Sequence, residues 1–576
     1  MKYKRYGWLL LLVVLVPILA YGQEAVLRLV PWTDGGDYLQ KQIIADTTAN
    51  GKLPNRVYEL TRGGLYLANA SFTNTGGWKL RLRAADSTIT RKPRIFLDKA
   101  GSGATPWNPP GNLFSIQGDL ELKNLIISGY YEPAKDSSLI RLQGQLIMIP
   151  STSSGLKITI DSCILTNSNG NHVRTEGPPS VVKITNSIFA NMGYLGRSNL
   201  GAGKAIDLRN VAVDSCIMVN NTFVNWQDRI VRHYPQSAGQ PTGQLNYFLF
   251  DHNTLVNGMS YHGMLSLGTM GGTAIITNNL LIDPFSLGQD SDKARQAEFL
   301  PSGELDQYGK ARMNWIFSYP DQTTAWTISN NYYSISDSGQ AFYNSYVSEP
   351  GFAGNEGQPL TWHINGRLGA DSASAFTKLS VVLNKIPEVM NKLNRWYRSP
   401  TGGVKSKNTP GAWVYGDMGA VPYSDPYDFD RKHYLWLRDT LDCKYSTSSP
   451  AYTGGVGGYP LGDLNWYPAL LDRWTKGLAV GVADAPRLPE QFSLEQNYPN
   501  PFNPATTISY SVPKESRVTL KVFDMLGREV ATLVNEVKQP GEYRLTFEAS
   551  RFASGAYVYR LSSPNQTIVR KMMLMK

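Results

Sequence analysis

The sequence predicts an all-β protein: a parallel β-helix, in which short strands wind into stacked coils, followed by a small two-sheet β-sandwich. Three observations lead to this prediction. A short phrase of apolar and polar residues recurs between residues 120 and 336. The chain contains 53 Gly, 34 Pro and 32 Tyr, which favours turn-rich β structure over a helical bundle. From residue 490 to the end, apolar and polar side chains alternate between Gly-containing breaks, as they do in hairpins.

The recurring phrase consists of an apolar pair, a polar pair that ends in Asn or Ser, two or three more apolar residues and a turn. It occurs seven times, and its polar position falls at Asn124, Ser162, Ser187, Asn221, Asn253, Asn279 and Asn331. The intervals between these positions are irregular. A constant phrase at irregular intervals predicts coils of constant shape that are joined by loops of variable length.

We expect the recurring Asn to lie at a corner between two strands of each coil. Asn tolerates the left-handed backbone conformation, and its side-chain amide can bond to the next coil. Equivalent side chains of stacked coils lie above one another, so identical residues form a ladder. His252, in the run FDHNTL, stands where other coils have a corner Asn, and we interpret it as a stacking residue.

Residues 1–22 have the three parts of a secretory signal peptide. A basic start (Lys2, Lys4 and Arg5) precedes an apolar run and two small residues, Ala20 and Gly22. We therefore expect an exported chain that begins at residue 23 after cleavage, with an uncleaved anchor as the alternative. No later apolar run approaches the roughly 18 residues of a membrane helix, so we expect no transmembrane segment after cleavage.

The net charge limits the class of partner, and the cysteines limit the possible disulfides and metal sites. Removing three basic residues lowers the formal charge from +10 to +7, which indicates either a solvated basic surface or attraction to anionic glycans. Nucleic acid is an unlikely partner outside the cell. The three scattered cysteines, Cys163, Cys216 and Cys443, cannot form a disulfide framework, and no cysteine or histidine spacing predicts a metal site. We expect a monomer stabilised by packing.

The β-helix is expected to span residues 23–375. The run WKLRLRAAD alternates apolar and basic residues, as a strand with one buried face does. The polar segment after Asn279 and the Gly-rich segment 191–210 are expected to leave the stack as loops, where binding residues of solenoids usually lie. We expect residues 376–485 to form a helical and irregular cap, because apolar residues have helical spacing between Thr377 and Arg398, interrupted at Pro387.

Residues 486–576 read as a linker and a separate Ig-like β-sandwich. The runs NYPNPFNPATTI (residues 497–508), VFDMLGREV (522–530), SGAYVYRL (554–561) and the basic end VRKMMLMK carry a family resemblance. They closely resemble the type A C-terminal sorting domain of the type IX secretion system, and more loosely the Ig-like domain of flagellar hook-capping proteins. The first resemblance implies passage through the type IX secretion machinery to the cell surface or the medium. An adhesive Ig-like module is the alternative.

The coil phrase resembles that of right-handed parallel β-helix proteins of the pectate-lyase-like superfamily over residues 23–336. This superfamily includes polysaccharide lyases, glycoside hydrolases and non-catalytic members, so the resemblance implies an architecture and leaves the activity open. The Asp-rich calcium motif of typical pectate lyases and the paired Asp of pectin hydrolases are not visible in the sequence.

A lyase removes the proton beside a uronate carboxylate, which a cation or an arginine must first neutralise. The densest group of suitable residues gives Lys204, Arg229 and Arg232 as candidate catalytic residues. They lie about one coil apart in sequence, so we expect them on neighbouring coils of one face. The cofactor is left open, with Ca²⁺ as the candidate.

The same two runs supply candidate substrate-binding residues: Arg209, Trp226, His233 and Tyr234, whose aromatic members can stack on sugar rings. The alternative is that these charges belong to solvated strand faces, with Asp228 pairing with Arg232 or Arg209. The sequence thus predicts an exported β-helix that is either a lyase acting on an acidic polysaccharide or a non-catalytic glycan-binding or structural surface protein.

Overall fold

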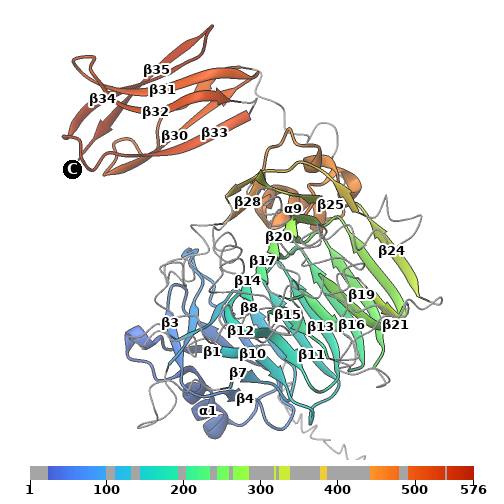
Figure 1. Cartoon of the computed structure of the whole chain (residues 1–576). Helices are drawn as coiled ribbons and strands as arrows, with labels where there is room; N and C mark the ends of the chain where they lie inside the picture. Colours follow the sequence, from blue (N-terminus) through green and yellow to red (C-terminus); the bar gives the residue numbers. More distant parts are fainter. Residues whose placement is uncertain are drawn as a thin grey trace, which may run out of the picture.

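The computed structural model describes residues 24–98, 111–131, 143–192, 203–209, 211–226, 228–233, 243–258, 264–284, 317–319, 324–337, 376–385, 441–478, 480, 491–538 and 541–575. Three features of the sequence lie outside these ranges: the predicted signal peptide, Tyr234, and the greater part of the polar segment that follows Asn279. The described strands confirm both predicted bodies, a parallel β-helix and an antiparallel β-sandwich (Figure 1).

The β-helix has three faces, each a parallel sheet with one short strand per coil. The first face consists of β1 (Ala25–Leu29), β2 (Arg56–Leu60), β5 (Leu80–Ala84), β8 (Leu120–Lys123), β11 (Leu156–Asp161), β13 (Pro179–Thr185), β16 (Val213–Val219), β19 (Leu245–Asp251), the end of β21 (Leu265–Thr277) and β24 (Ala325–Ser329). Connections between parallel strands of one sheet are right-handed in nearly all proteins, which agrees with the predicted sense of the coil.

The other two faces follow the same rule. The second consists of β3 (Leu65–Ala68), β6 (Arg94–Leu97), β9 (Ile126–Tyr131), the start of β12 (Ile164–Thr175), β14 (Ile188–Met192), β17 (Thr222–Trp226), β20 (Thr254–Gly258), β22 (Leu280–Pro284), β25 (Asn331–Ser334) and β26 (Phe376–Lys378). The third consists of β4 (Phe72–Thr73), β7 (Asn112–Ser115), β10 (Gln143–Ile149), the end of β12, β15 (Lys204–Asp207), β18 (Val231–His233), the start of β21 and β23 (Phe317–Tyr319).

Equivalent residues of successive coils stack in register and form one continuous core. On the first face, Val182 pairs with Cys216, which pairs with Phe248, and all three side chains are fully buried. On the second face, the rings of Phe189 and Phe223 lie 5.5 Å apart. A single coil exposes both of its edges, so the burial of these residues depends on the coils above and below.

The corner between the first and second faces uses two adjacent residues for the two tasks that we assigned to one Asn. The first residue has the left-handed backbone, as at Asn220 (φ 54°) and His252 (φ 50°). The second points inward and forms the ladder. The Asn253 side chain accepts hydrogen bonds from the backbone N–H (3.1 Å) and the side-chain amide (3.0 Å) of Asn221, and donates to Met218 O (3.0 Å) and to Asn279 Oδ1 (3.1 Å).

A second Asn ladder, which we did not predict, lies at the corner between the second and third faces. Its members also have positive φ angles. Asn191 Nδ2 donates to Asn167 Oδ1 (2.9 Å), Asn225 Nδ2 to Asn191 Oδ1 (2.8 Å), and Asn257 Nδ2 to Asn225 Oδ1 (3.2 Å). In four of the seven sequence phrases, the Asn that ends the apolar part therefore both turns the backbone and forms a ladder.

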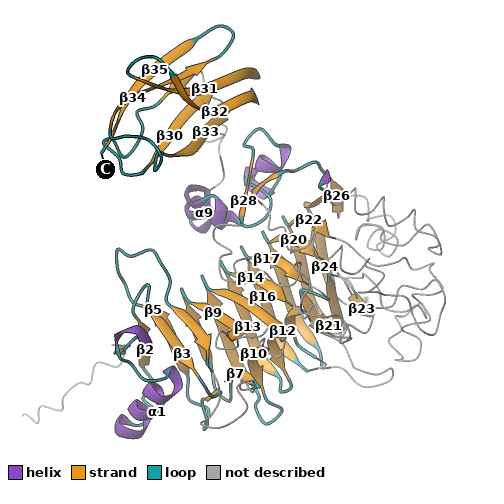
Figure 2. Ribbon diagram, turned by 60° about the vertical axis from the view of Figure 1, so that its left-hand side comes forward, coloured by secondary structure: helices purple, strands orange, loops and turns teal. Residues whose placement is uncertain are grey.

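The N-terminal end of the stack is covered by α1 (Leu39–Asn50), next to a short 3-10 helix, η1 (Trp32–Asp34), where we expected only β-rich coils (Figure 2). Leu39 and Ile43 join the core, and Asp46 accepts a hydrogen bond from the Tyr58 hydroxyl (2.9 Å) and pairs with Arg56 (3.0 Å). This helix shields the first coil from solvent, which a solenoid needs at its ends.

The expected helical cap is wrong for residues 377–385. Phe376 is buried at the start of β26, which continues the second face, and β27 (Leu383–Lys385) pairs with β28 (Asp442–Tyr445). Local helical spacing is overridden here because each strand completes a sheet. Residues 386–440 lie outside the described ranges.

A segment that we call the strap, residues 441–478, covers the outer side of the second face. It contains β28, the 3-10 helices η6 (Pro450–Thr453), η7 (Val456–Gly458) and η8 (Leu464–Trp466), and α9 (Pro468–Thr475). Its Leu461 and Leu464 pack on the outward side chains of Val224, Val256 and Ile282, all of which are buried. The strap is therefore a side cover along several coils.

The C-terminal sandwich has one sheet of three strands and one of four. The first contains β29 (Ser493–Leu494), β30 (Ala505–Val512) and β33 (Gly541–Glu548). The second contains β31 (Ser516–Asp524), β32 (Glu529–Lys538), β34 (Gly555–Ser562) and β35 (Thr567–Leu574). Ile508, Leu520 and Tyr559 form part of its own buried core.

Candidate functional site

The candidate catalytic residues lie on neighbouring coils of the third face, as the sequence predicted. β15 and β18 pair in parallel, with Ile206 opposite Val231 and Asp207 opposite Arg232. Lys204 is the first residue of β15. Asp228 and Arg229 come just before β18, so the register of this pair brings the charged residues together.

These charges form a buried cluster of three cations and two carboxylates. Lys204 Nζ lies 2.7 Å from Asp228 Oδ2, and Arg229 Nη1 lies 3.3 Å from the same oxygen. Arg232 Nη1 lies 3.5 Å from Asp207 Oδ2. The relative exposure of the five residues ranges from 0% to 8%. Asp228 thus pairs with Lys204 and Arg229, and Arg232 pairs with Asp207.

Burial and neighbouring charges shift the pKa values of residues in the cluster. Burial lowers the pKa of Lys204, against the opposing attraction of Asp228 and Asp207. Burial also acts to raise the pKa of Asp207, but the charges of Arg232 and Lys204 outweigh it and the net shift is downward. A lysine of lowered pKa beside fixed carboxylates is a common arrangement at functional sites and also occurs in structural ion pairs.

The coil below adds a residue that the sequence did not single out. Asn171, in β12, lies opposite Lys204 in the register and is 3% exposed. Its Nδ2 donates to Asp207 Oδ2 (3.2 Å), and its Oδ1 accepts from the backbone N–H of Lys204 (3.4 Å). Asn171 therefore positions both ends of β15. Only the register between coils identifies it, because it lies far from the charged runs in sequence.

The structure places the candidate substrate-binding residues differently from our expectation. Trp226 is fully buried in the core, and its indole lies over Gly258, where any Cβ would clash with the ring. His233 is fully buried and donates from Nε2 to Val211 O (2.8 Å), and burial lowers its pKa to about 4. Arg209 lies at the edge of the cluster, with its Nε 4.0 Å from Glu176.

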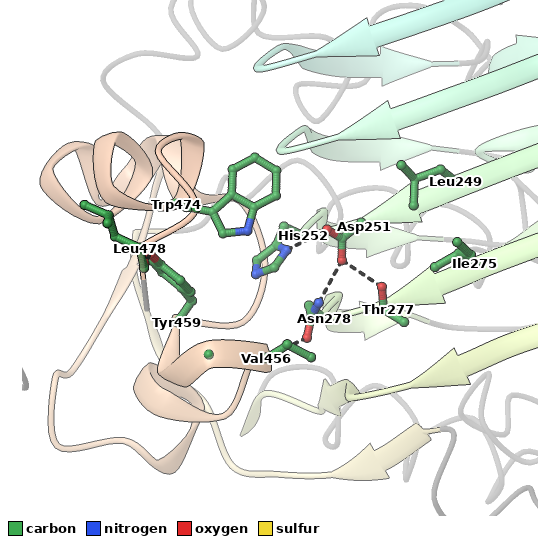
Figure 3. Close-up of a pocket in the computed structure, with 12 residues that line it drawn as sticks. Leu249, Asp251, His252, Ile275, Thr277, Asn278, Val456, Tyr459, Trp474 and Leu478 are labelled. Carbon is green, nitrogen blue, oxygen red and sulfur yellow. Dashed lines mark hydrogen bonds and ion pairs between the residues drawn. The ribbon is translucent and has the colours of Figure 1, made fainter. Parts of the chain in front are cut away.

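A separate pocket lies at the corner between the first and second faces, beneath the strap (Figure 3). His252 occupies the left-handed corner position of its coil, and its Nδ1 lies 2.9 Å from Asp251 Oδ2. Asp251 Oδ1 accepts from Thr277 Oγ1 (2.8 Å) and from Asn278 Nδ2 (2.8 Å). Burial acts to raise the pKa of Asp251, but these hydrogen bonds, led by that of His252, lower it overall.

The opposite wall of this pocket comes from the strap. Trp474 of α9 meets the His252 ring edge-on at 5.5 Å, and Tyr459 and Leu478 complete the wall. The pocket has a volume of about 460 Å³ and opens to solvent. The sequence predicted the corner position of His252 but not the pocket, because its two walls are separated by at least 178 residues of the chain.

Two kinds of feature are absent from the described ranges. No three His, Cys, Asp or Glu side chains of the described residues lie close enough to hold a metal ion. No helix in those ranges is both long and apolar enough to cross a membrane. The three cysteines are buried and free.

Comparison with known proteins identifies one part of the chain. Residues 496–575, which contain β30 to β35, match the family model of the secretion system C-terminal sorting domain. Comparison with curated proteins finds no match for the chain. Except for Lys576, the matched range includes the runs that carried the sequence resemblance, and its described residues belong to the sandwich. The chain therefore carries a type IX secretion sorting domain and is exported to the cell surface or the extracellular space.

Proposed function

We propose that the protein is an exported polysaccharide lyase that acts on an acidic glycan at the Lys204 cluster. The observation that carries the proposal is the convergence of Lys204, Arg229 and Arg232 from two neighbouring coils. Arg229 and Arg232 carry the positive charges that a uronate carboxylate would be attracted to, and a buried site strengthens such an attraction.

In this proposal Lys204 is the general base. Its lowered pKa favours the neutral amine, which can accept the proton from the carbon beside the uronate carboxylate. The C–H electron pair forms the new double bond, and the glycosidic oxygen leaves with the electron pair of the broken C–O bond. Water protonates this oxygen, and the Lys204 ammonium returns its proton to solvent. Arg229 and Arg232 neutralise the carboxylate and stabilise the negative charge that develops on it. Asp207 and Asn171 position these groups.

A non-catalytic glycan-binding or structural β-helix is the second candidate, and a specific observation favours it. Lys204 and Arg229 are at most 1% exposed and already share Asp228 as a partner, as buried structural ion pairs do. Under this candidate the cluster holds the coils together and meets no substrate.

The two candidates differ in product formation. The purified chain is incubated with pectin, alginate and glycosaminoglycans, and unsaturated chain ends are followed by ultraviolet absorbance. A lyase generates absorbance that Lys204→Met and Arg232→Ala abolish, whereas Lys157→Met, at an exposed site on the first face, leaves it unchanged. Circular dichroism shows whether each variant has folded. Absence of product across the panel, or unchanged product in a folded Lys204→Met variant, would refute the lyase proposal.

A further inference from the structure

We propose that the pocket beneath the strap binds a neutral sugar unit of a glycan, independently of the Lys204 cluster. The pocket lies at the corner between the first and second faces, whereas the cluster lies on the third. The proposal concerns a second site and does not depend on lyase activity.

His252 is the polar group that points to a ligand. It is 1% exposed, and its Nδ1 faces Asp251 Oδ2. Asp251 Oδ2 accepts the hydrogen bond from Nδ1–H, and in this tautomer Nε2 carries an acceptor lone pair. In the described part of the chain Nε2 has no hydrogen-bond partner. Figure 3 shows this nitrogen on the side of the ring turned away from Asp251. A hydroxyl donor would satisfy it.

The polar wall is held in place before any ligand arrives. Thr277 and Asn278 both donate to Asp251 Oδ1, so the carboxylate that orients His252 is fixed from two further positions. Asn278 Oδ1 in turn accepts the backbone N–H of Val456 in the strap (3.0 Å). The network therefore joins two coils and the strap, and a ligand would bind it without ordering new side chains.

The opposite wall suits the apolar face of a pyranose ring. Trp474 is partly exposed, and Leu478 and Val456 are 48% and 61% exposed, although each is a large apolar side chain. An indole offers a flat apolar surface, and sugar rings have C–H groups on one face and hydroxyls at the edge. Aromatic and aliphatic groups on one side with a few fixed polar groups on the other are typical of small-molecule sites, whose usual volumes include 460 Å³.

Charge selects a neutral sugar over an acidic one. No Lys or Arg is among the described residues that line the pocket, and the carboxylate there, Asp251, has a lowered pKa and is ionised. A uronate or a sulfated sugar would meet this negative charge with no cation to balance it. We therefore expect the pocket to prefer neutral sugar units and the Lys204 cluster to prefer acidic ones.

The test measures binding by calorimetry on the full mature chain, with cellohexaose, xylohexaose, mannohexaose and maltohexaose as neutral probes and oligogalacturonate as the acidic probe. Two variants alter the pocket. His252→Asn removes the Nε2 acceptor and keeps the left-handed corner, since Asn occupies that position at Asn220 and Asn278. Trp474→Ala removes the stacking surface. Trp32→Ala, at a partly exposed Trp near the N-terminal end, is the matched control.

We expect at least one neutral probe to bind, and both pocket variants to weaken it about tenfold or more, which corresponds to about 1.4 kcal/mol each. Trp32→Ala and Lys204→Met should bind it as the wild type does. The proposal is overturned if no neutral probe binds, if folded His252→Asn and Trp474→Ala retain wild-type affinity, or if binding is lost in folded Lys204→Met. Loss of lyase activity alone affects only the proposed function.

Discussion

Replacing Asn253 by Ala should destabilise the β-helix by about 4 kcal/mol, because its fully buried side chain makes four hydrogen bonds. A typical hydrogen bond contributes about 1 kcal/mol net, and a buried group left without its partner costs about as much or more. The substitution removes the acceptor of the Asn221 backbone N–H and a donor to Met218 O. The ladder is interrupted between two coils.

A graded series makes this prediction sharper. Asn253→Ser should cost less than Asn253→Ala, because Ser187 occupies the equivalent position two steps along the ladder, where its Oγ accepts from Cys163 N (3.0 Å) and donates to Thr185 O (2.7 Å). Asn246→Ala, at an exposed position of β19 in the same coil, is the control and should change stability by about 0.5 kcal/mol or less.

The assay is urea denaturation of the four proteins, followed by tryptophan fluorescence and circular dichroism at one protein concentration. The urea concentration at the unfolding midpoint should be highest for Asn246→Ala, lower for Asn253→Ser and lowest for Asn253→Ala. If Asn253→Ala unfolds with the same midpoint and slope as Asn246→Ala, the inward ladder does not hold the coils together and the energetic argument fails.

Three further predictions concern pH and export. His172 is fully buried, its ring nitrogens have no hydrogen-bond partner among described residues, and burial lowers its pKa to about 3. The folded state therefore binds fewer protons than the unfolded one, and stability is lost as pH falls from about 6.5 toward 3. His172→Phe should reduce this loss between pH 7 and pH 4.5, and an equal loss in both proteins would contradict the assignment. Burial raises the pKa of Asp463 to about 7, so its contribution is lost as pH rises from about 4 through 7. Asp463→Asn should gain stability relative to the wild type at pH 8 more than at pH 5, and the reverse order would show that folding does not raise the pKa of this carboxyl. A chain truncated before residue 490 should stay inside the cell envelope on immunoblots of cell and medium fractions, whereas its normal export would refute the sorting role.

The repeated phrase was sufficient to predict the β-helix, because stacking forces each coil to put the same residue types at the same positions. It also predicted the left-handed corners, which Asn220, His252 and Asn278 adopt. It did not separate the residue that turns the backbone from the residue that forms the ladder. Adjacent Asn residues look alike in sequence, and only the direction of each side chain distinguishes them.

The surroundings of each candidate residue were harder to predict. Lys204 and Arg232 do lie on paired strands, since one coil is a nearly constant length of chain there. Trp226 was expected to stack on a sugar, but a strand of five buried residues places it in the core, where Gly258 makes room for it. The burial of each candidate residue depends on which residues of the next coil and of the strap lie opposite it. Those residues are distant in sequence.

The strap explains why the residue at the left-handed corner differs from coil to coil. Asn278 Oδ1 accepts from Val456 N (3.0 Å), Asn220 Oδ1 from Leu464 N (3.4 Å), and Asn186 Oδ1 from Asn465 Nδ2 (3.4 Å). In the intervening coil the corner residue is His252, and the strap meets it with Trp474 instead of a hydrogen bond. An Asn at that position would satisfy the backbone equally well. The choice of His therefore follows neither from the coil nor from the turn. Among the described corners that the strap contacts, Asn186, Asn220, His252 and Asn278, this one departs from Asn, and it does so where the contact between strap and corner becomes a pocket. A ligand site requires such a change of residue, whereas a scaffold does not.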